Sequence, residues 1–84
     1  MKINKEEIEK TVMHVIADRL DVDIKKIRND TLLLNELGMD SFGAVELTFE
    51  LKDRFGIEIP QEQFSKIKKV KDIVKYISTH LNEK

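Results

Sequence analysis

The chain has 84 residues, enough for one small domain with a single core but too few for a second catalytic domain. Hydrophobic residues make up 40% and charged residues 37%, which argues against a disordered chain. There is no Cys, so the chain itself supplies neither a disulfide nor a thiolate, and any thiol it uses must be imported. No apolar run reaches membrane-spanning length and the first residues do not resemble a signal peptide, so we expect a soluble, cytoplasmic monomer.

The formal net charge is −1, but the charges are unevenly distributed. Residues 36–62 contain seven acidic residues against two basic ones, whereas residues 63–84 contain six basic residues against two acidic ones. We therefore expect the middle of the chain to prefer basic partner surfaces and the C-terminal end to avoid them.

Residues 4–20 are predicted to form an amphipathic helix. Asn4, with Glu7 three residues later, resembles a capping box, and apolar residues recur at helical spacing from Ile8 to Leu20. Residues 21–39 are predicted to be a long loop, which leucines at positions 32–37 could pin to the core.

A second helix is predicted from about Ser41 to Phe55, because a turn signal and an N-cap candidate precede it and Gly56 follows it. Residues 61–67 are predicted to form a helix of one or two turns, and the apolar spacing from residue 70 to residue 81 predicts a last helix. The expected fold is all-α: a small four-helix bundle with three longer helices, one short helix and a long loop between the first and second. The side chains expected mainly in the core are Phe49, Leu51, Phe55, Ile59, Phe64, Ile67 and Ile77.

Residues 37–42 read Leu-Gly-Met-Asp-Ser-Phe and residues 45–47 read Val-Glu-Leu, a pattern that resembles the signature of the acyl carrier protein family. Residues 56–60, Gly-Ile-Glu-Ile-Pro, also match the family, although Phe42 replaces its usual leucine. The resemblance covers about Glu7 to Leu81, so residues 1–84 are interpreted as a single carrier domain with the four-helix fold of the family.

A serine at the start of a helix can carry a long substituent outward, and the helix N-terminus favours the negative charge of a phosphodiester. Asp40, as N-cap, would hold the turn in place. The resemblance implies that a phosphopantetheinyl transferase attaches 4'-phosphopantetheine from coenzyme A to Ser41. It also implies a non-catalytic carrier that holds acyl or related intermediates as thioesters on the thiol of that arm.

The resemblance further implies an acidic surface beside Ser41, which contacts acyl-loading and acyl-processing enzymes through their basic docking surfaces. The residues expected to bind partners are Glu36, Phe42, Val45, Glu46, Glu50 and Ile67. An acyl chain would be sheltered between the second helix and its neighbours, in a pocket formed by Met39, Phe49, Leu51, Phe64 and Ile67. Because Phe49 and Phe64 are bulky, we expect a reduced pocket that suits a short or poorly buried acyl group.

Residues 52–54 read Lys-Asp-Arg where typical fatty-acid carriers have a run of glutamates, and Gly43 is a feature of some D-alanyl and other specialised carriers. We therefore favour a carrier for a dedicated lipid, polyketide or aminoacyl pathway, with a general fatty-acid synthesis carrier as the alternative. A third hypothesis is an unmodified helical interaction adaptor, whose mark would be a lost serine or a broken signature, and neither is seen.

The lysines at positions 66, 68, 69 and 71 are interpreted as a solvated linker rather than a nucleic-acid or membrane site, because no aromatic residues interleave with them. His14 and His80 lie far apart, without cysteines or carboxylates at ligand spacing, so no metal site is expected. Neither histidine is placed in the sequence to activate Ser41, which argues against catalysis by the chain alone.

Overall fold

The computed structural model describes residues 4–81. The elements in chain order are α1 (Lys5–Leu20), the 3₁₀ helix η1 (Ile24–Lys26), α2 (Ser41–Phe55), α3 (Gln61–Phe64) and α4 (Val70–Leu81). The described residues contain no strand, only an isolated bridge between Leu32 and Lys69. The all-α prediction, with three longer helices and one short one, is therefore confirmed.

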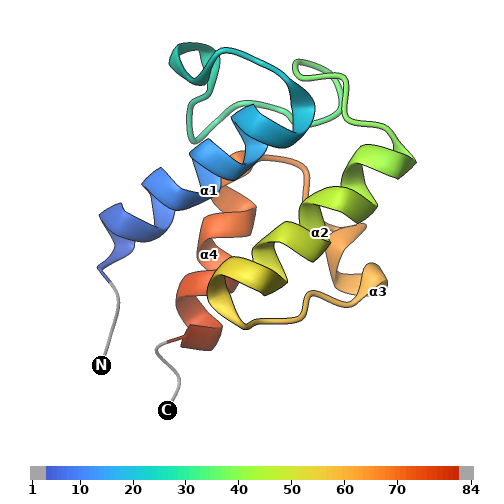
Figure 1. Cartoon of the computed structure of the whole chain (residues 1–84). Helices are drawn as coiled ribbons and strands as arrows, with labels where there is room; N and C mark the ends of the chain where they lie inside the picture. The colour runs from blue at the N-terminus through green and yellow to red at the C-terminus, as the bar shows by residue number, and fades with distance from the viewer. Residues whose placement is uncertain (1–3, 82–84) are drawn as a thin grey trace.

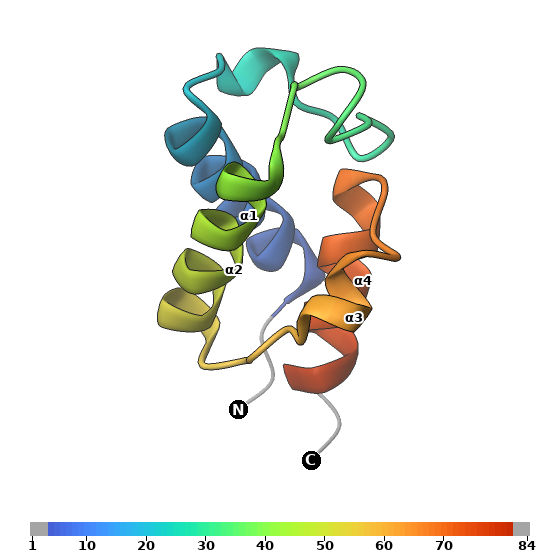
Figure 2. The same cartoon turned by 90° about the vertical axis from the view of Figure 1, so that its right-hand side faces the viewer.

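Three helices surround the core, and the segment between α1 and α2 crosses one end of the bundle (Figures 1 and 2). α1 packs against both α2 and α4, which gives the bundle its shared interior. α1 begins and α4 ends at the end of the molecule away from that crossing segment (Figure 1). The start of α2 therefore lies at the same end as the long loop, where the signature residues are.

The helix ends follow from local chemistry. The Asn4 side chain accepts a hydrogen bond of 2.7 Å from the amide of Glu6, so Asn4 caps α1 as predicted, although the amide it binds lies one residue before Glu7. α2 ends at Gly56, which has a φ of 68°, a left-handed conformation that glycine adopts without strain. α3 ends at Phe64 rather than at Ile67, and the next amides continue the turn through hydrogen bonds to residues three or four back.

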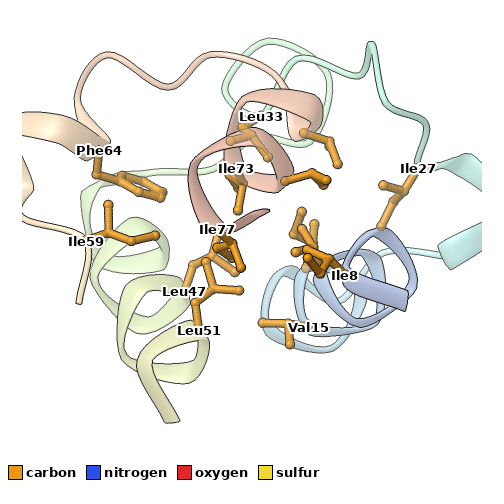
Figure 3. Close-up of a cluster of buried hydrophobic side chains, with 14 residues drawn as sticks. Ile8, Val15, Ile27, Leu33, Leu47, Leu51, Ile59, Phe64, Ile73 and Ile77 are labelled. Atoms are coloured by element: carbon orange, nitrogen blue, oxygen red, sulfur yellow. The ribbon is translucent and has the colours of Figure 1, made fainter. Parts of the chain in front are cut away.

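The core brings α1, α2 and α4 together with two anchors from the long loop, Ile27 and Leu33 (Figure 3). Two more core residues, Ile59 and Phe64, come from the segment that contains α3. Full burial of one such aliphatic side chain is worth about 1.5–3 kcal/mol, so the loop is held by packing although it has little regular structure. The remaining core residues are Ile8, Val12, Val15, Ile16, Leu47, Leu51, Val70, Ile73, Val74 and Ile77.

One core prediction is wrong: the side chain of Phe49 is 68% exposed. Leu47 and Leu51 of α2 are fully buried, and Phe49 lies two residues from each of them. Two residues correspond to about 200° of rotation around a helix, so Phe49 points away from the core.

The long loop is also fixed by backbone hydrogen bonds to the segment between α3 and α4. The amide of Leu33 donates to the carbonyl of Lys68 at 3.0 Å, and the amide of Val70 donates to the carbonyl of Thr31 at 3.1 Å. The same Leu33 accepts, at its carbonyl, a hydrogen bond of 3.0 Å from the amide of Met39. A single loop residue thus connects the α3–α4 segment to the chain just before Ser41.

Candidate functional site

Ser41 is the first residue of α2 and is exposed. Asp40, immediately before it, is the N-cap, and its Oδ1 accepts a hydrogen bond of 2.7 Å from the amide of Gly43. The carbonyl of Asp40 accepts from the amide of Ala44 at 2.9 Å. The turn that presents Ser41 is therefore held at both its side chain and its backbone, while the serine side chain faces solvent.

The start of α2 fits a phosphodiester on the Ser41 hydroxyl. Within the described residues, the amides of Ser41 and Phe42 have no acceptor, as expected for the first positions of a helix. Such free amides, together with the helix dipole, favour an anion at this end. The carboxylate of Asp40 is directed to Gly43, so one nearby negative charge is already engaged.

Ser41 also lies on the edge of a groove of about 790 Å³ between α2, the long loop and the segment containing α3. Of the five residues predicted to form an acyl pocket, Met39, Phe64 and Ile67 line this groove. Leu51 is fully buried in the core and Phe49 faces outward, so neither reaches it. The predicted partner residues Val45 and Ile67 also line it.

Much of the groove lining was missed by the sequence analysis. Ala44 and Thr48 were missed although they follow Ser41 at helical spacing, a signal that could have identified them. The wall formed by the long loop had no such signal, because it depends on contacts between distant segments. The remaining lining residues that were missed are Leu32, Leu33, Leu34, Asn35, Ile59, Gln61, Ser65 and Lys68.

The outer face of α2 carries an apolar ridge that starts beside Ser41. Its members are Phe42, 71% exposed, Val45, 46% exposed, and Phe49, 68% exposed. They lie three and four residues apart, so they share one face of the helix. Exposed aromatic side chains in a row are a common feature of protein interaction surfaces.

The acidic residues expected beside Ser41 differ in their exposure and in whether a basic side chain pairs with them. Glu36 and Asp40 are exposed, and Glu46 is half-buried. Glu50 is different: its two oxygens accept hydrogen bonds from Arg19 at 2.6 Å and from Arg54 at 2.9 Å. The hydrogen bonds from Arg19 and then Arg54 hold the pKa of Glu50 below its usual range, so Glu50 stays ionised but fully paired.

Among residues 4–81, no group of three or more histidine, cysteine or carboxylate side chains could hold a metal ion. His80 stacks on Tyr76, with ring centroids 4.0 Å apart, and its Nδ1 lies 2.8 Å from the carbonyl oxygen of Tyr76. Within the same described residues, no helix is long and apolar enough to cross a membrane.

Comparison with known proteins decides the family. The family model for the phosphopantetheine attachment site matches residues 10–77, most of the chain. The chain is also 42% identical over 73 residues to an acyl carrier protein of Rickettsia bellii (strain RML369-C), covering 87% of this chain and 85% of that protein. The chain belongs to the acyl carrier protein family. An acyl carrier protein of Lactobacillus acidophilus (strain ATCC 700396 / NCK56 / N2 / NCFM) is 41% identical over 78 residues, which cover 93% of this chain and 98% of that protein.

Membership in the family confirms two of the expectations from the sequence. The acyl carrier protein described here is a phosphopantetheine attachment domain. It is a carrier and not an enzyme, so its chemistry lies in what it holds and in the enzymes that it meets.

Proposed function

We propose that Ser41 carries 4'-phosphopantetheine and that the protein presents acyl or related thioesters to partner enzymes. The observation that supports this most directly is the position of the Ser41 side chain, exposed on the first turn of α2 and at the edge of the groove. A group attached there can reach either the groove or an enzyme in contact with α2.

The chain's own residues position the attached group. Asp40 holds the turn through Gly43, and the free amides of Ser41 and Phe42 face the position of the phosphodiester. When bound, the group supplies the thiol that this cysteine-free chain lacks. Phosphopantetheinyl transferases and acyl-loading enzymes would dock over the exposed ridge Phe42, Val45 and Phe49, and their basic groups would face Glu36, Asp40 and Glu46.

The cargo that the groove favours is a short or incompletely buried acyl group. Phe64 lines the groove and belongs to the core, so its large ring fills space between the two that a smaller side chain would leave open to an acyl chain. Polar side chains also line the groove, among them Thr48, Gln61 and Ser65. The hydroxyls of Thr48 and Ser65 donate to the carbonyls of Val45 and Glu62, but a long alkyl chain would cover the exposed Gln61 amide and remove its contact with water.

A dedicated lipid, polyketide or aminoacyl pathway is favoured over general fatty-acid synthesis. The second half of α2 carries Lys52 and Arg54 instead of an acidic run, and Arg54 is engaged with Glu50. The second half of α2 therefore mixes Asp53 with these two basic residues and has no continuous acidic run. We propose the cytoplasm as the compartment, since a cysteine-free chain suits a reducing environment, and we expect a monomer that binds no nucleic acid.

The test is intact-protein mass spectrometry after incubation with coenzyme A and a broad-specificity phosphopantetheinyl transferase. The wild type should gain one phosphopantetheinyl group and Ser41→Ala should gain none. Ser65→Ala is the matched control, because Ser65 is exposed and lines the same groove, and this variant should be modified like the wild type. Absence of any gain on the wild type would instead favour the unmodified adaptor.

A further inference from the structure

Among residues 4–81, Leu34 is the one large, exposed apolar residue that lies outside α2. It is 66% exposed, and it does not belong to the half-buried hydrophobic residues that pack against the core. The other exposed apolar residues of this size form the ridge Phe42, Val45 and Phe49 on α2. A leucine at position 34 therefore contributes little to the core.

The turn that carries Leu34 is fixed by hydrogen bonds. The carbonyl of Leu34 accepts from the amide of Gly38 at 3.1 Å, and the carbonyl of Leu32 accepts from the amide of Glu36 at 3.0 Å. The preceding residue, Leu33, is buried in the core. A side chain on a fixed backbone loses less conformational freedom on binding than one on a mobile loop. Leu34 is therefore exposed on a backbone that is already ordered for a partner.

Leu34 extends the apolar surface of α2 across the groove. Leu34 and Val45 both line the groove on whose edge Ser41 lies, Leu34 from the loop and Val45 from α2. The loop and the start of α2 also lie at the same end of the molecule in both views (Figures 1 and 2). A single exposed leucine needs no explanation, but this one belongs to an apolar surface that continues on both sides of the groove beside Ser41.

An enzyme that modifies Ser41 itself has to approach this surface closely. The Oγ of Ser41 attacks the phosphorus that bears the pantetheine, the new O–P bond forms as the bond to adenosine bisphosphate breaks, and the hydroxyl proton is released. A standard interface buries about 800 Å² on each partner, a patch roughly 30 Å across. The described residues span 34 × 27 × 19 Å, so a patch of that size centred on Ser41 covers the loop as well as α2.

We propose that Leu34 is a docking contact for the phosphopantetheinyl transferase, which holds the carrier on both sides of Ser41. Apolar side chains of the enzyme cover Leu34 on the loop side and the ridge on the α2 side. Enzymes that act on the thiol at the end of the arm do not need to reach Ser41, so Leu34 matters less to them. The inference rests on the proposed function, because it assumes that Ser41 is the residue modified.

The test compares Leu34→Gln with Leu34→Met, two side chains of similar length that differ in the polarity of their ends. The probe is a broad-specificity phosphopantetheinyl transferase with plain coenzyme A, and the readouts are KM and kcat for the unmodified chain. Leu34→Gln should raise KM about fivefold or more and leave kcat unchanged, because docking energy is lost equally before and during the reaction. Leu34→Met should keep KM within about twofold of the wild type.

Three results would overturn the proposal. KM can be unchanged in Leu34→Gln, it can rise equally in both variants, or kcat can fall at unchanged KM, which would assign Leu34 to the presentation of Ser41 rather than to docking. Urea unfolding should give the same midpoint for both variants and the wild type, since Leu34 lies outside the core. Failure of the proposed function has a different signature, because the wild type would then gain no phosphopantetheine.

A second arm separates docking from contact with the cargo, since Leu34 also lines the groove. The same measurements are repeated with acetyl-coenzyme A as the donor. A docking contact predicts the same rise in KM for Leu34→Gln with both donors, because plain coenzyme A carries no acyl group. A rise with acetyl-coenzyme A alone would show that Leu34 contacts the cargo, and the proposal would fail.

Discussion

The Oδ1 of Asp40 accepts a hydrogen bond of 2.7 Å from the amide of Gly43, so the two residues enclose Ser41 within one capped turn. Because this bond satisfies a free amide of α2, Asp40→Ala should lower the free energy of unfolding by about 1 kcal/mol. Urea unfolding followed by circular dichroism measures the change. Asp40→Asn keeps an acceptor and should lose much less, whereas equal losses in both variants would show that charge rather than capping matters.

Gly43 is buried at the point where α2 approaches the end of α1. A Cβ added there would lie 3.1 Å from Cδ2 of Leu20 and 3.2 Å from Oδ1 of Asp40, tighter than an ordinary contact. We expect Gly43→Ala to be destabilising, although alanine favours a helix by about 1 kcal/mol over glycine.

A double-mutant cycle separates the two effects of this substitution. In a Leu20→Ala background the close contact with Leu20 is removed, so Gly43→Ala should cost less free energy of unfolding than it does in the wild type. If the cost is the same in both backgrounds, Leu20 is not the residue that requires glycine at this position.

Asp72 stabilises the start of α4 in a pH-dependent way. Its Oδ2 accepts hydrogen bonds from the amides of Lys69 at 3.0 Å and Lys68 at 3.1 Å. Burial by itself would raise the pKa of Asp72. The hydrogen bonds from the amides of Lys69 and Lys68, together with nearby lysine charges, lower the pKa by more than burial raises it, so the net shift is downward.

Because the pKa of Asp72 is lower in the folded state than in the unfolded state, its contribution is fully present above its ordinary value of 3.8 and is lost as pH falls through the folded-state pKa. The melting temperature of Asp72→Asn should therefore lie below that of the wild type at pH 7, and the gap should narrow below about pH 4. Thermal unfolding from pH 7 to pH 2.5 measures the gap. A gap that is constant with pH would contradict this role.

Truncation of Phe49 and of Leu51, two residues apart on α2, should affect different properties: Leu51→Ala should lower stability, and Phe49→Ala should lower activity with partner enzymes. Leu51→Ala empties a fully buried site and should cost about 2–5 kcal/mol in the free energy of unfolding. Phe49→Ala removes an exposed ring and should change stability by less than about 0.5 kcal/mol. Because Phe49 belongs to the exposed ridge over which we propose that partner enzymes dock, the same variant should lower kcat/KM with those enzymes. Unfolding curves and enzyme assays on one protein preparation distinguish the two roles.

The ends of α1 and α2 could be predicted because they depend on short-range chemistry, whereas η1 and the early end of α3 were not predicted. Asn4, Asp40 and Gly56 are at helix ends for reasons that a single turn supplies, and the structure places all three there. Phe49 was misplaced because apolar residues at 45, 47, 49 and 51 alternate along α2, and that run alone does not show which of them face inward.

The contacts that complete the candidate site join distant parts of the chain. The ion pair between Arg19 and Glu50 connects residues 31 positions apart, and the bond from Leu33 to Lys68 also spans two elements. Neither contact produces a pattern in the local sequence. The pairing of Glu50 and the loop wall of the groove could therefore be identified only in the folded chain.

The two hydrogen bonds of Leu33 give the groove walls unequal stiffness. On the loop side, the amide and the carbonyl of this buried residue are both engaged, so that wall moves only if packing and hydrogen bonds break together. On the opposite side, α3 is four residues long and has one buried side chain, Phe64. A cargo too large for the groove would therefore displace α3 rather than the loop, while Ser41 and its turn keep their position relative to the rest of the bundle.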